Sequence, residues 1–191
     1  RDYQRHGLTW LADLTDLGLG ACLADDMGLG KTITVIALHL HRHAEHAEHA
    51  EHAEHAEHAA HESPGPAAGP TLVVCPTSLL GNWEAEIRRF APGVDVRRFH
   101  GARRDLADLD GGFVLTTYGT LRVDKVALAE VAWGLVVADE AQHVKNAASS
   151  TARALRAIPG TARVALTGTP VENDLTELWA ILDWAIPGLL G

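Results

Sequence analysis

The sequence predicts an α/β domain in which a parallel β-sheet carries helices on both faces. Short apolar runs alternate along the chain with longer segments whose apolar residues recur at helical spacing, a pattern typical of such sheets. The chain has 191 residues, enough for one domain with a sizeable core. Hydrophobic residues make up 47% of it and aromatic residues only 5%, so we expect an interior built mainly from aliphatic side chains.

Predicted strands and helices follow one another along the whole chain. The apolar runs predict strands over residues 21–24, 71–75, 94–99, 113–116, 135–138 and 163–166. Helical periodicity predicts helices over residues 3–14, 31–41, 79–90, 147–157 and 175–185. Because ligands of parallel sheets bind at the carboxyl ends of the strands, the polar residues that follow each strand are the first candidates for a functional site.

One segment departs from this alternation. Over residues 43–58 the chain repeats His-Ala-Glu, and nine of its 12 histidines lie within residues 39–61. Three residues turn by about 300° on a helix, so no residue type keeps to one face and the segment cannot join a core. We interpret residues 43–62 as a low-complexity insertion, a solvated extension of the preceding helix. A metal-binding tract is the alternative, since histidines three residues apart share a helix face, but without further fixed ligands adventitious binding is favoured.

Charge, cysteines and hydropathy exclude few functions. Six acids and no lysine or arginine lie within residues 43–62, so without them the formal charge of −9 becomes −3. That charge neither supports nor excludes a polyanionic partner.

Cys22 and Cys75 lie in predicted strands without metal-site or redox spacing, so we interpret them as reduced thiols. No apolar run approaches the ~20 residues that span a bilayer and no signal peptide is visible, so we expect a cytoplasmic protein. A chain that begins at Arg1 is expected to be part of a longer one.

A glycine-rich turn follows the first predicted strand and opens a helix. Residues 25–32 read Asp-Asp-Met-Gly-Leu-Gly-Lys-Thr, and such glycines let backbone N–H groups converge on an anion at a helix N-terminus. In a loop of this kind Lys31 reaches the β- and γ-phosphates of a nucleotide and the Thr32 hydroxyl binds Mg²⁺. Asp25 stands where the generic motif has glycine, and a plain glycine-rich turn is the alternative. The predicted phosphate-binding residues are Asp26, Met27, Gly28, Leu29, Gly30, Lys31 and Thr32.

Two carboxylates follow the predicted strand at residues 135–138. Beside a phosphate loop, Asp139 is suited to hold Mg²⁺, and Glu140 is suited to orient and deprotonate the attacking water. We therefore predict Glu140, Asp139 and Lys31 as catalytic residues, and Thr32 and Asp139 as magnesium ligands. Taken alone, an apolar strand that ends in Asp-Glu is more often a solvated strand end.

The last predicted strand also runs into a polar turn, which contains Thr167 and Thr169. These hydroxyls are placed to sense the γ-phosphate of a nucleotide or to hydrogen-bond Asp139 and Glu140. Turn formation alone is the alternative explanation. The two preceding motifs favour a role at the nucleotide.

These motifs together resemble those of superfamily 2 helicases, and specifically the Swi/Snf-type ATPases, most closely the bacterial members. The order of residues 25–32, the Asp-Glu-Ala-Gln box at 139–142 and Leu-Thr-Gly-Thr-Pro at 166–170 carries the resemblance. Asp25 is the family's usual residue in the loop. Further family segments match residues 1–11, 75–83, 116–121, 139–146 and 171–179. The resemblance therefore covers nearly the whole chain apart from the His-Ala-Glu tract.

The resemblance implies a RecA-like P-loop lobe over residues 1–191 that binds ATP and Mg²⁺, with Gln4 reading the adenine edge. It implies DNA-stimulated ATP hydrolysis coupled to movement on duplex DNA, often without strand separation, in a bacterial, nucleoid-associated protein. In the family a second RecA-like lobe supplies an arginine finger. We expect that lobe to be absent from these residues, so the fragment alone should bind ATP but hardly hydrolyse it.

Polar groups at two other strand ends suit a DNA backbone, because hydroxyl and backbone N–H groups bind phosphate oxygens. The family's DNA-contacting motifs match the same positions, and the candidate DNA contacts are Pro76, Thr77, Ser78, Thr116 and Thr117. Capping of the following helices explains these residues equally well, and both roles are compatible. The arginine pairs at 88–89, 97–98 and 103–104 carry little weight, because most such pairs are solvated.

Two rival functions belong to other classes. A nucleotide-gated module that holds ATP and DNA without turnover needs no base, and the presence of Glu140 argues against it. A His-rich metal buffer would make the tract the functional part, and an ATP site that works independently of such metals would reject it.

Overall fold

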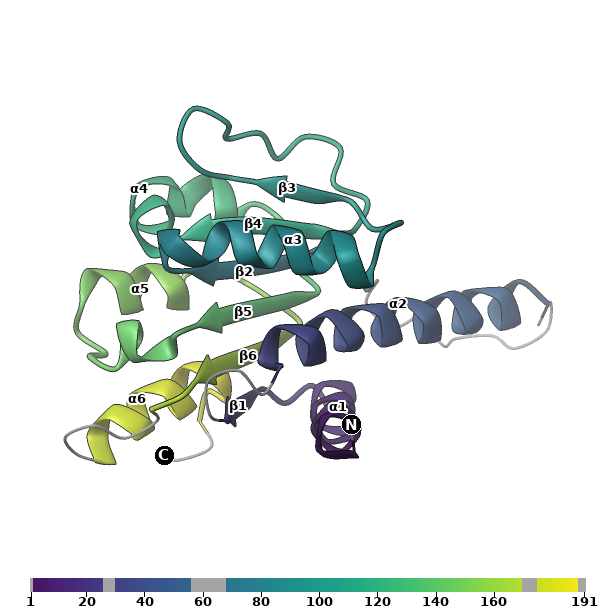
Figure 1. The fold of residues 1–191 in the computed structure, drawn as a ribbon, viewed down its shortest axis with the longest axis horizontal. Helices are drawn as coiled ribbons and strands as arrows, with labels where there is room; N and C mark the ends of the chain where they lie inside the picture. The colour runs from purple at the N-terminus through teal and green to yellow at the C-terminus, as the bar shows by residue number, and fades with distance from the viewer. Residues whose placement is uncertain (1, 26–29, 56–67, 170–174, 189–191) are drawn as a thin grey trace.

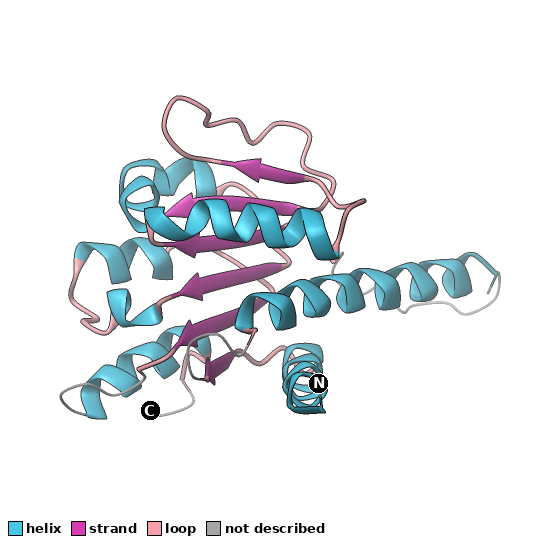
Figure 2. Cartoon of the chain, in the orientation of Figure 1, coloured by secondary structure: helices cyan, strands magenta, loops and turns pink. Residues whose placement is uncertain are grey.

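The computed structural model describes residues 2–25, 30–55, 68–169 and 175–188. Its helices and strands alternate along the chain, as Figures 1 and 2 show. In order they are α1 (Asp2–Asp16), β1 (Ala21–Ala24), α2 (Lys31–His55), β2 (Thr71–Cys75), η1 (Thr77–Leu79), α3 (Leu80–Phe90), β3 (Val96–Arg98), β4 (Phe113–Thr117), α4 (Tyr118–Ala129), β5 (Leu135–Asp139), η2 (Ala141–Val144), α5 (Ser150–Arg156), β6 (Ala162–Thr167) and α6 (Leu175–Ala185).

Within the described residues the strands form one sheet in the order β1-β6-β5-β2-β4-β3, and every pairing is parallel. The predicted α/β class is confirmed. The order places the first strand, β1, beside the last, β6, which lies beside β5. Ala24 is in register with Thr167, and Asp139 with Leu166. The segments that follow β1, β6 and β5 therefore meet at one carboxyl edge of the sheet.

Two apolar cores lie on opposite faces of this sheet. Helices α1, α2 and α3 cover one face, where Ile36 and Trp83 are fully buried. Helices α4, α5 and α6 cover the other, where Leu121 and Trp184 are buried. The expectation of an aliphatic interior holds for most core positions. The scarce aromatic residues are nevertheless used there, because three tryptophans are among the largest fully buried side chains: Trp83, Trp133 and Trp184.

The sequence did not predict helix α4. It begins at Thr117, whose side-chain oxygen accepts a hydrogen bond from the N–H of Thr120 and so caps the helix. Asp124 interrupts it with non-helical angles (φ −107°, ψ 24°), and Val123 and Val126 are exposed. The apolar residues therefore do not follow one helical stripe, which is the signal that sequence periodicity requires.

Helix α2 continues from its buried first half into the His-Ala-Glu tract as far as His55, and Figure 1 shows this extension projecting beyond the sheet. The predicted helical extension is confirmed to that point; residues 56–62 lie outside the described part of the chain. The first histidine of the tract differs from the expectation of a fully solvated segment. His43 is half-buried, and its Nε2 lies 3.1 Å from the backbone oxygen of Gly69. Its ring centroid is 4.3 Å from that of the buried His39.

Candidate nucleotide site

The glycine-rich turn and helix α1 meet at the start of α2. Gly30 has a positive φ of 86°, and a Cβ built there would lie 2.4 Å from Nε2 of Gln4. The positive φ favours glycine at this position, and the short distance shows that the adenine-reading candidate Gln4 lies directly against the turn. Lys31 is the first residue of α2, and its Nζ donates to the backbone oxygen of Asp25 at 2.5 Å. Four predicted residues lie outside the described part of the chain: Asp26, Met27, Gly28 and Leu29.

Asp139 ends strand β5 as a buried carboxylate, 7% exposed. Its Oδ2 accepts a hydrogen bond from the indole N–H of Trp83 at 2.7 Å, and its Oδ1 accepts one from the backbone N–H of Glu140 at 2.9 Å. Burial raises the pKa of Asp139 from its ordinary value, while these two hydrogen bonds and the positive charge of Lys31 act to lower it. The turn lysine and the strand-end carboxylate therefore interact electrostatically.

Glu140 adopts a left-handed conformation, with φ 52° and ψ 56°. That conformation costs a non-glycine residue about 1–2 kcal/mol, and residues held in it cluster at functional sites. The Oε2 of Glu140 accepts a hydrogen bond from Nε2 of Gln142 at 2.6 Å. Glu140 is half-buried, so its carboxylate is held in place without being sealed from the edge of the sheet.

Thr167 joins the same network through Gln142. Its hydroxyl donates to Oε1 of Gln142 at 3.2 Å, and its oxygen accepts from the backbone N–H of Thr169 at 3.1 Å. Thr167 therefore takes part in the turn and is also linked to the Glu140 carboxylate. This link is indirect, because the amide of Gln142 lies between the two side chains. Thr167 is fully buried, whereas Thr169 is exposed.

Sequence reasoning missed three residues that support this network. Trp83 and Gln142 fell within family segments but were given no role at the nucleotide. The hydroxyl of Tyr118 donates to the backbone oxygen of Asp139 at 2.7 Å from a buried position. A buried indole N–H needs an acceptor, and that requirement was the available signal for Trp83. Which acceptor it finds depends on α3 packing against β5, and the sequence alone does not reveal this.

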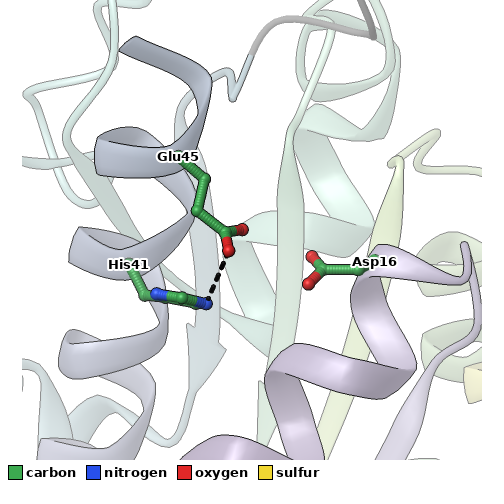
Figure 3. A group of neighbouring side chains, drawn as sticks. All are labelled: Asp16, His41 and Glu45. Atoms are coloured by element: carbon green, nitrogen blue, oxygen red, sulfur yellow. Dashed lines mark ion pairs between the residues drawn. The ribbon is translucent and has the colours of Figure 1, made fainter. Parts of the chain in front are cut away.

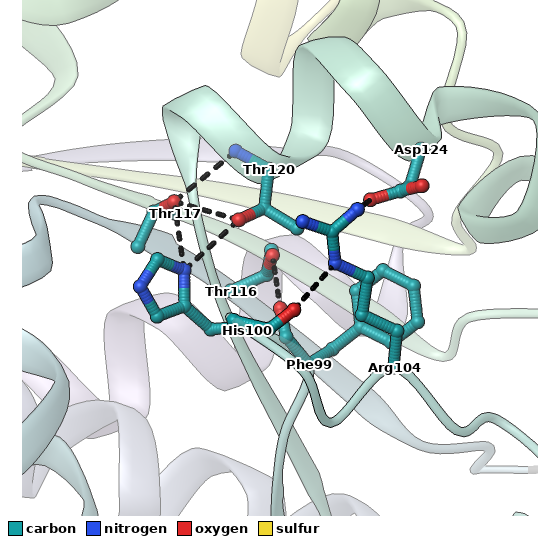
Figure 4. Close-up of polar contacts among 8 residues, drawn as sticks. Phe99, His100, Arg104, Thr116, Thr117, Thr120 and Asp124 are labelled. Atoms are coloured by element: carbon teal, nitrogen blue, oxygen red, sulfur yellow. Dashed lines mark hydrogen bonds and ion pairs between the residues drawn. The ribbon is translucent and has the colours of Figure 1, made fainter.

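The candidate DNA contacts divide into two groups. Thr116 and Thr117 are buried: the first donates to the backbone oxygen of Phe99 at 2.9 Å, and the second caps α4. Figure 4 shows that His100 completes this network, with its Nδ1 3.0 Å from Oγ1 of Thr120. The capping explanation is confirmed for Thr117.

The second group follows strand β2. Thr77 and Ser78 are exposed and Pro76 is half-buried. No side chain caps η1 or α3, so the capping explanation is wrong for these three residues. Their contact with DNA stays a prediction.

Four of the six arginines in these pairs bind acids on the protein's own surface. Arg88 lies 2.5 Å from Glu84, Arg97 2.8 Å from Asp95 and Arg104 2.7 Å from Asp124, and Arg98 also pairs with Glu84. These contacts agree with the low weight that the sequence gave the pairs as DNA contacts.

A family model described as "SNF2-related domain" matches residues 3–191. The chain belongs to the SNF2-related family. It is 43% identical over 197 residues to YwqA of Bacillus subtilis, a protein whose name describes an ATP-dependent helicase/translocase. It is also 35% identical over 198 residues to the TATA-binding protein-associated factor MOT1 of Saccharomyces cerevisiae. Each match covers the whole chain, but only 19% of YwqA and 10% of MOT1.

Solved SNF2-type structures share the fold. The SWI2/SNF2 ATPase core of Sulfolobus solfataricus in complex with double-stranded DNA superposes with a TM-score of 0.79 at 40% identity. The ATPase core domain from the same organism superposes with a TM-score of 0.75 at 39% identity. All of the present chain is covered, and it spans 36% and 35% of those two chains. The resemblance to Swi/Snf ATPases and the RecA-like lobe predicted from sequence are confirmed. No helix among the described residues is long and apolar enough to cross a membrane.

Proposed function

We propose that this lobe binds Mg-ATP at the carboxyl edge of its sheet and, joined to a second lobe, couples ATP hydrolysis to movement on duplex DNA. The observation that carries the proposal is the buried Asp139, held within the electrostatic reach of Lys31 and followed directly by Glu140. The helicase/translocase name of YwqA and the DNA complex of the archaeal ATPase core support the reaction and its partner.

The donor groups at this edge fit Mg²⁺. Asp139 offers carboxylate oxygen, and Thr32, in the first turn of α2, offers a hydroxyl; oxygen donors of this kind are the ligands that Mg²⁺ prefers. Burial penalises the ionised form of Asp139, and a nearby dication favours that form. The bound ion would supply charge neutralisation for the phosphates, with Asp139 and Thr32 holding it.

The remaining residues divide the chemistry of phosphoryl transfer. Lys31 and the N-terminus of α2 bind phosphate oxygens and offset their charge. Glu140, oriented by the amide of Gln142, accepts a proton from the attacking water. Thr167 holds the other end of that amide, so a change at the threonine turn reaches the base. We assign the adenine contact to Gln4, and the DNA backbone contacts to the exposed hydroxyls of Thr77 and Ser78.

The test separates ATP binding from hydrolysis in the two-lobed parent protein. Glu140→Gln preserves the size of the side chain but removes the base, so we expect ATP affinity to persist while DNA-stimulated turnover falls by roughly 10²–10⁴-fold. Lys31→Ala should lose most of the ATP affinity. The measurements are equilibrium binding of a fluorescent ATP analogue and steady-state phosphate release with and without duplex DNA.

Glu130→Gln provides the matched control, since Glu130 is exposed at the opposite end of β5 from Asp139. This variant should behave like the parent in both assays. If Glu140→Gln hydrolyses ATP at the rate of the parent protein, the assignment of Glu140 as the base is wrong. ATP and DNA binding without turnover in the parent itself would favour the rival function of a nucleotide-gated module.

A further inference from the structure

Three potential metal ligands meet where α1 ends beside α2. Asp16 is the last residue of α1, while His41 and Glu45 lie one turn apart on α2. One ligand atom from each residue lies within 4.8 Å of the other two. Figure 3 shows the three side chains turned toward one another across the gap between the helices. The trio lies away from the carboxyl edge that carries Asp139, and no residue of the nucleotide site belongs to it.

Two of the ligands already have a chelating arrangement. Nε2 of His41 lies 3.2 Å from Oε1 of Glu45, close to the roughly 3.3 Å that separates neighbouring ligands around a tetrahedral ion with bonds of about 2.0–2.1 Å. Both side chains are partly shielded, at 39% and 42% exposure. Asp16 is exposed, so rotation of its side chain can bring its carboxylate to a similar distance from Nε2 of His41 and Oε1 of Glu45.

A second observation also favours a cation at this point. The C-terminal end of a helix carries partial negative charge and favours cations, yet the last turn of α1 has no basic residue and ends on Asp16 itself. Burial lowers the pKa of the neighbouring Arg42, while Asp16 and Glu45 act to raise it, so the positive charge of Arg42 offsets part of the negative charge here. Two carboxylates therefore lie near one guanidinium at the end of α1.

We propose that Asp16, His41 and Glu45 form a binding site for a divalent first-row transition ion, of which Zn²⁺ is the probe. A mixed set of one imidazole and two carboxylates suits such ions better than Ca²⁺ or Mg²⁺, which prefer oxygen ligands alone. Water completes the coordination on the exposed side. A bound ion ties the end of α1, the helix of Gln4, to α2, the helix of Lys31. The His-Ala-Glu tract forms the later turns of α2, and Glu45 belongs to its first repeat.

The experiment must separate the trio from the rest of the tract, residues 46–62. In the full-length protein we replace residues 46–62 with a Gly-Ser linker, which keeps all three ligands, and measure Zn²⁺ binding without nucleotide by competition with a chromophoric chelator. We expect one site to persist, with Asp16→Asn, His41→Ala and Glu45→Gln each weakening it by at least about tenfold. Zn²⁺ should also raise the melting temperature of the linker protein, and this gain should vanish in the three variants.

Asp13→Asn and His6→Ala are the matched controls, since both residues are exposed on the same helix α1. These variants should keep the affinity of the linker protein. The proposal is overturned if the linker protein no longer binds Zn²⁺, because the ion is then bound by residues 46–62. Equal affinity in the trio variants and the linker protein would also overturn it.

Discussion

At the scale of single residues, the site depends on the opposing effects that set the pKa of a buried carboxylate. Asp139 loses hydration on burial, and the indole N–H of Trp83, the backbone N–H of Glu140 and the charge of Lys31 act against the resulting rise in its pKa. A carboxylate must be ionised to hold Mg²⁺. We therefore propose that Trp83 is a positioning residue, which acts from helix α3 on the pKa of the proposed metal ligand Asp139.

The substitution Trp83→Phe in the two-lobed parent tests this role. Without the N–H the pKa of Asp139 rises further, so the acidic limb of the ATPase pH profile should move to higher pH. Stability should fall by about 1.5–3 kcal/mol, the contribution of a hydrogen bond to a charged group. Phosphate release measured across pH, together with chemical denaturation, checks both expectations.

Trp133→Phe provides the control for this variant. Trp133 is equally buried, and its indole N–H donates to the backbone oxygen of Leu128 at 2.7 Å, away from the carboxyl edge. Its replacement should lower stability by about 0.5–1.5 kcal/mol and leave the pH profile unchanged. The same shift in both variants would mean that loss of packing, and not the Asp139 bond, moves the profile.

At the scale of elements, α2 combines a buried and a solvated half in one helix. Its first turns carry Lys31 and pack Ile36 into the core, while its later turns carry the His-Ala-Glu repeat, which is exposed at residues 47–50. The boundary between the two halves lies inside the tract, because His43 packs on His39 and hydrogen-bonds Gly69. Burial of His39 lowers its pKa to about 3, so this junction holds a neutral imidazole.

Two linker replacements locate that boundary. Replacing residues 46–62 with a Gly-Ser linker should leave ATP affinity and the free energy of unfolding unchanged, because the described part of that segment lies outside the core. Replacing residues 43–62 should cost about 1 kcal/mol of stability, since it also removes the His43 hydrogen bond. Denaturant unfolding and nucleotide titration measure the two effects. Equal stability of both proteins would show that His43 contributes nothing.

At the scale of the whole molecule, the fold is one lobe of an SNF2-type ATPase core. The chain spans 36% of the archaeal ATPase core that it resembles. Lys31, Asp139 and Glu140, the described candidates for catalysis, gather at the carboxyl edge of its sheet. Phosphoryl transfer develops negative charge that an arginine finger stabilises. The family resemblance assigns that finger to the second lobe, so a complete site requires both.

Residues 1–191 alone should therefore bind ATP and turn it over roughly 10³–10⁵-fold more slowly than the two-lobed parent. Their affinity for duplex DNA should be weaker and fall less steeply with salt, because fewer phosphate contacts are made. Steady-state phosphate release at saturating DNA, with binding measured across salt concentrations, tests both expectations. Robust DNA-stimulated turnover by residues 1–191 would contradict the two-lobe mechanism.

The sequence by itself determined the α/β class and most elements, and it placed a glycine-rich segment before Lys31 and the pair Asp139 and Glu140 at the end of a strand. These are local signals: apolar runs, glycine spacing and acids at a strand end. Only the tertiary structure decided how they combine. The strand order β1-β6-β5 brings Lys31 and Asp139 together, and packing of α3 gives Asp139 its tryptophan partner. Helix packing likewise brings Asp16 to His41 and Glu45. Contacts between distant segments depend on packing, which no local pattern encodes.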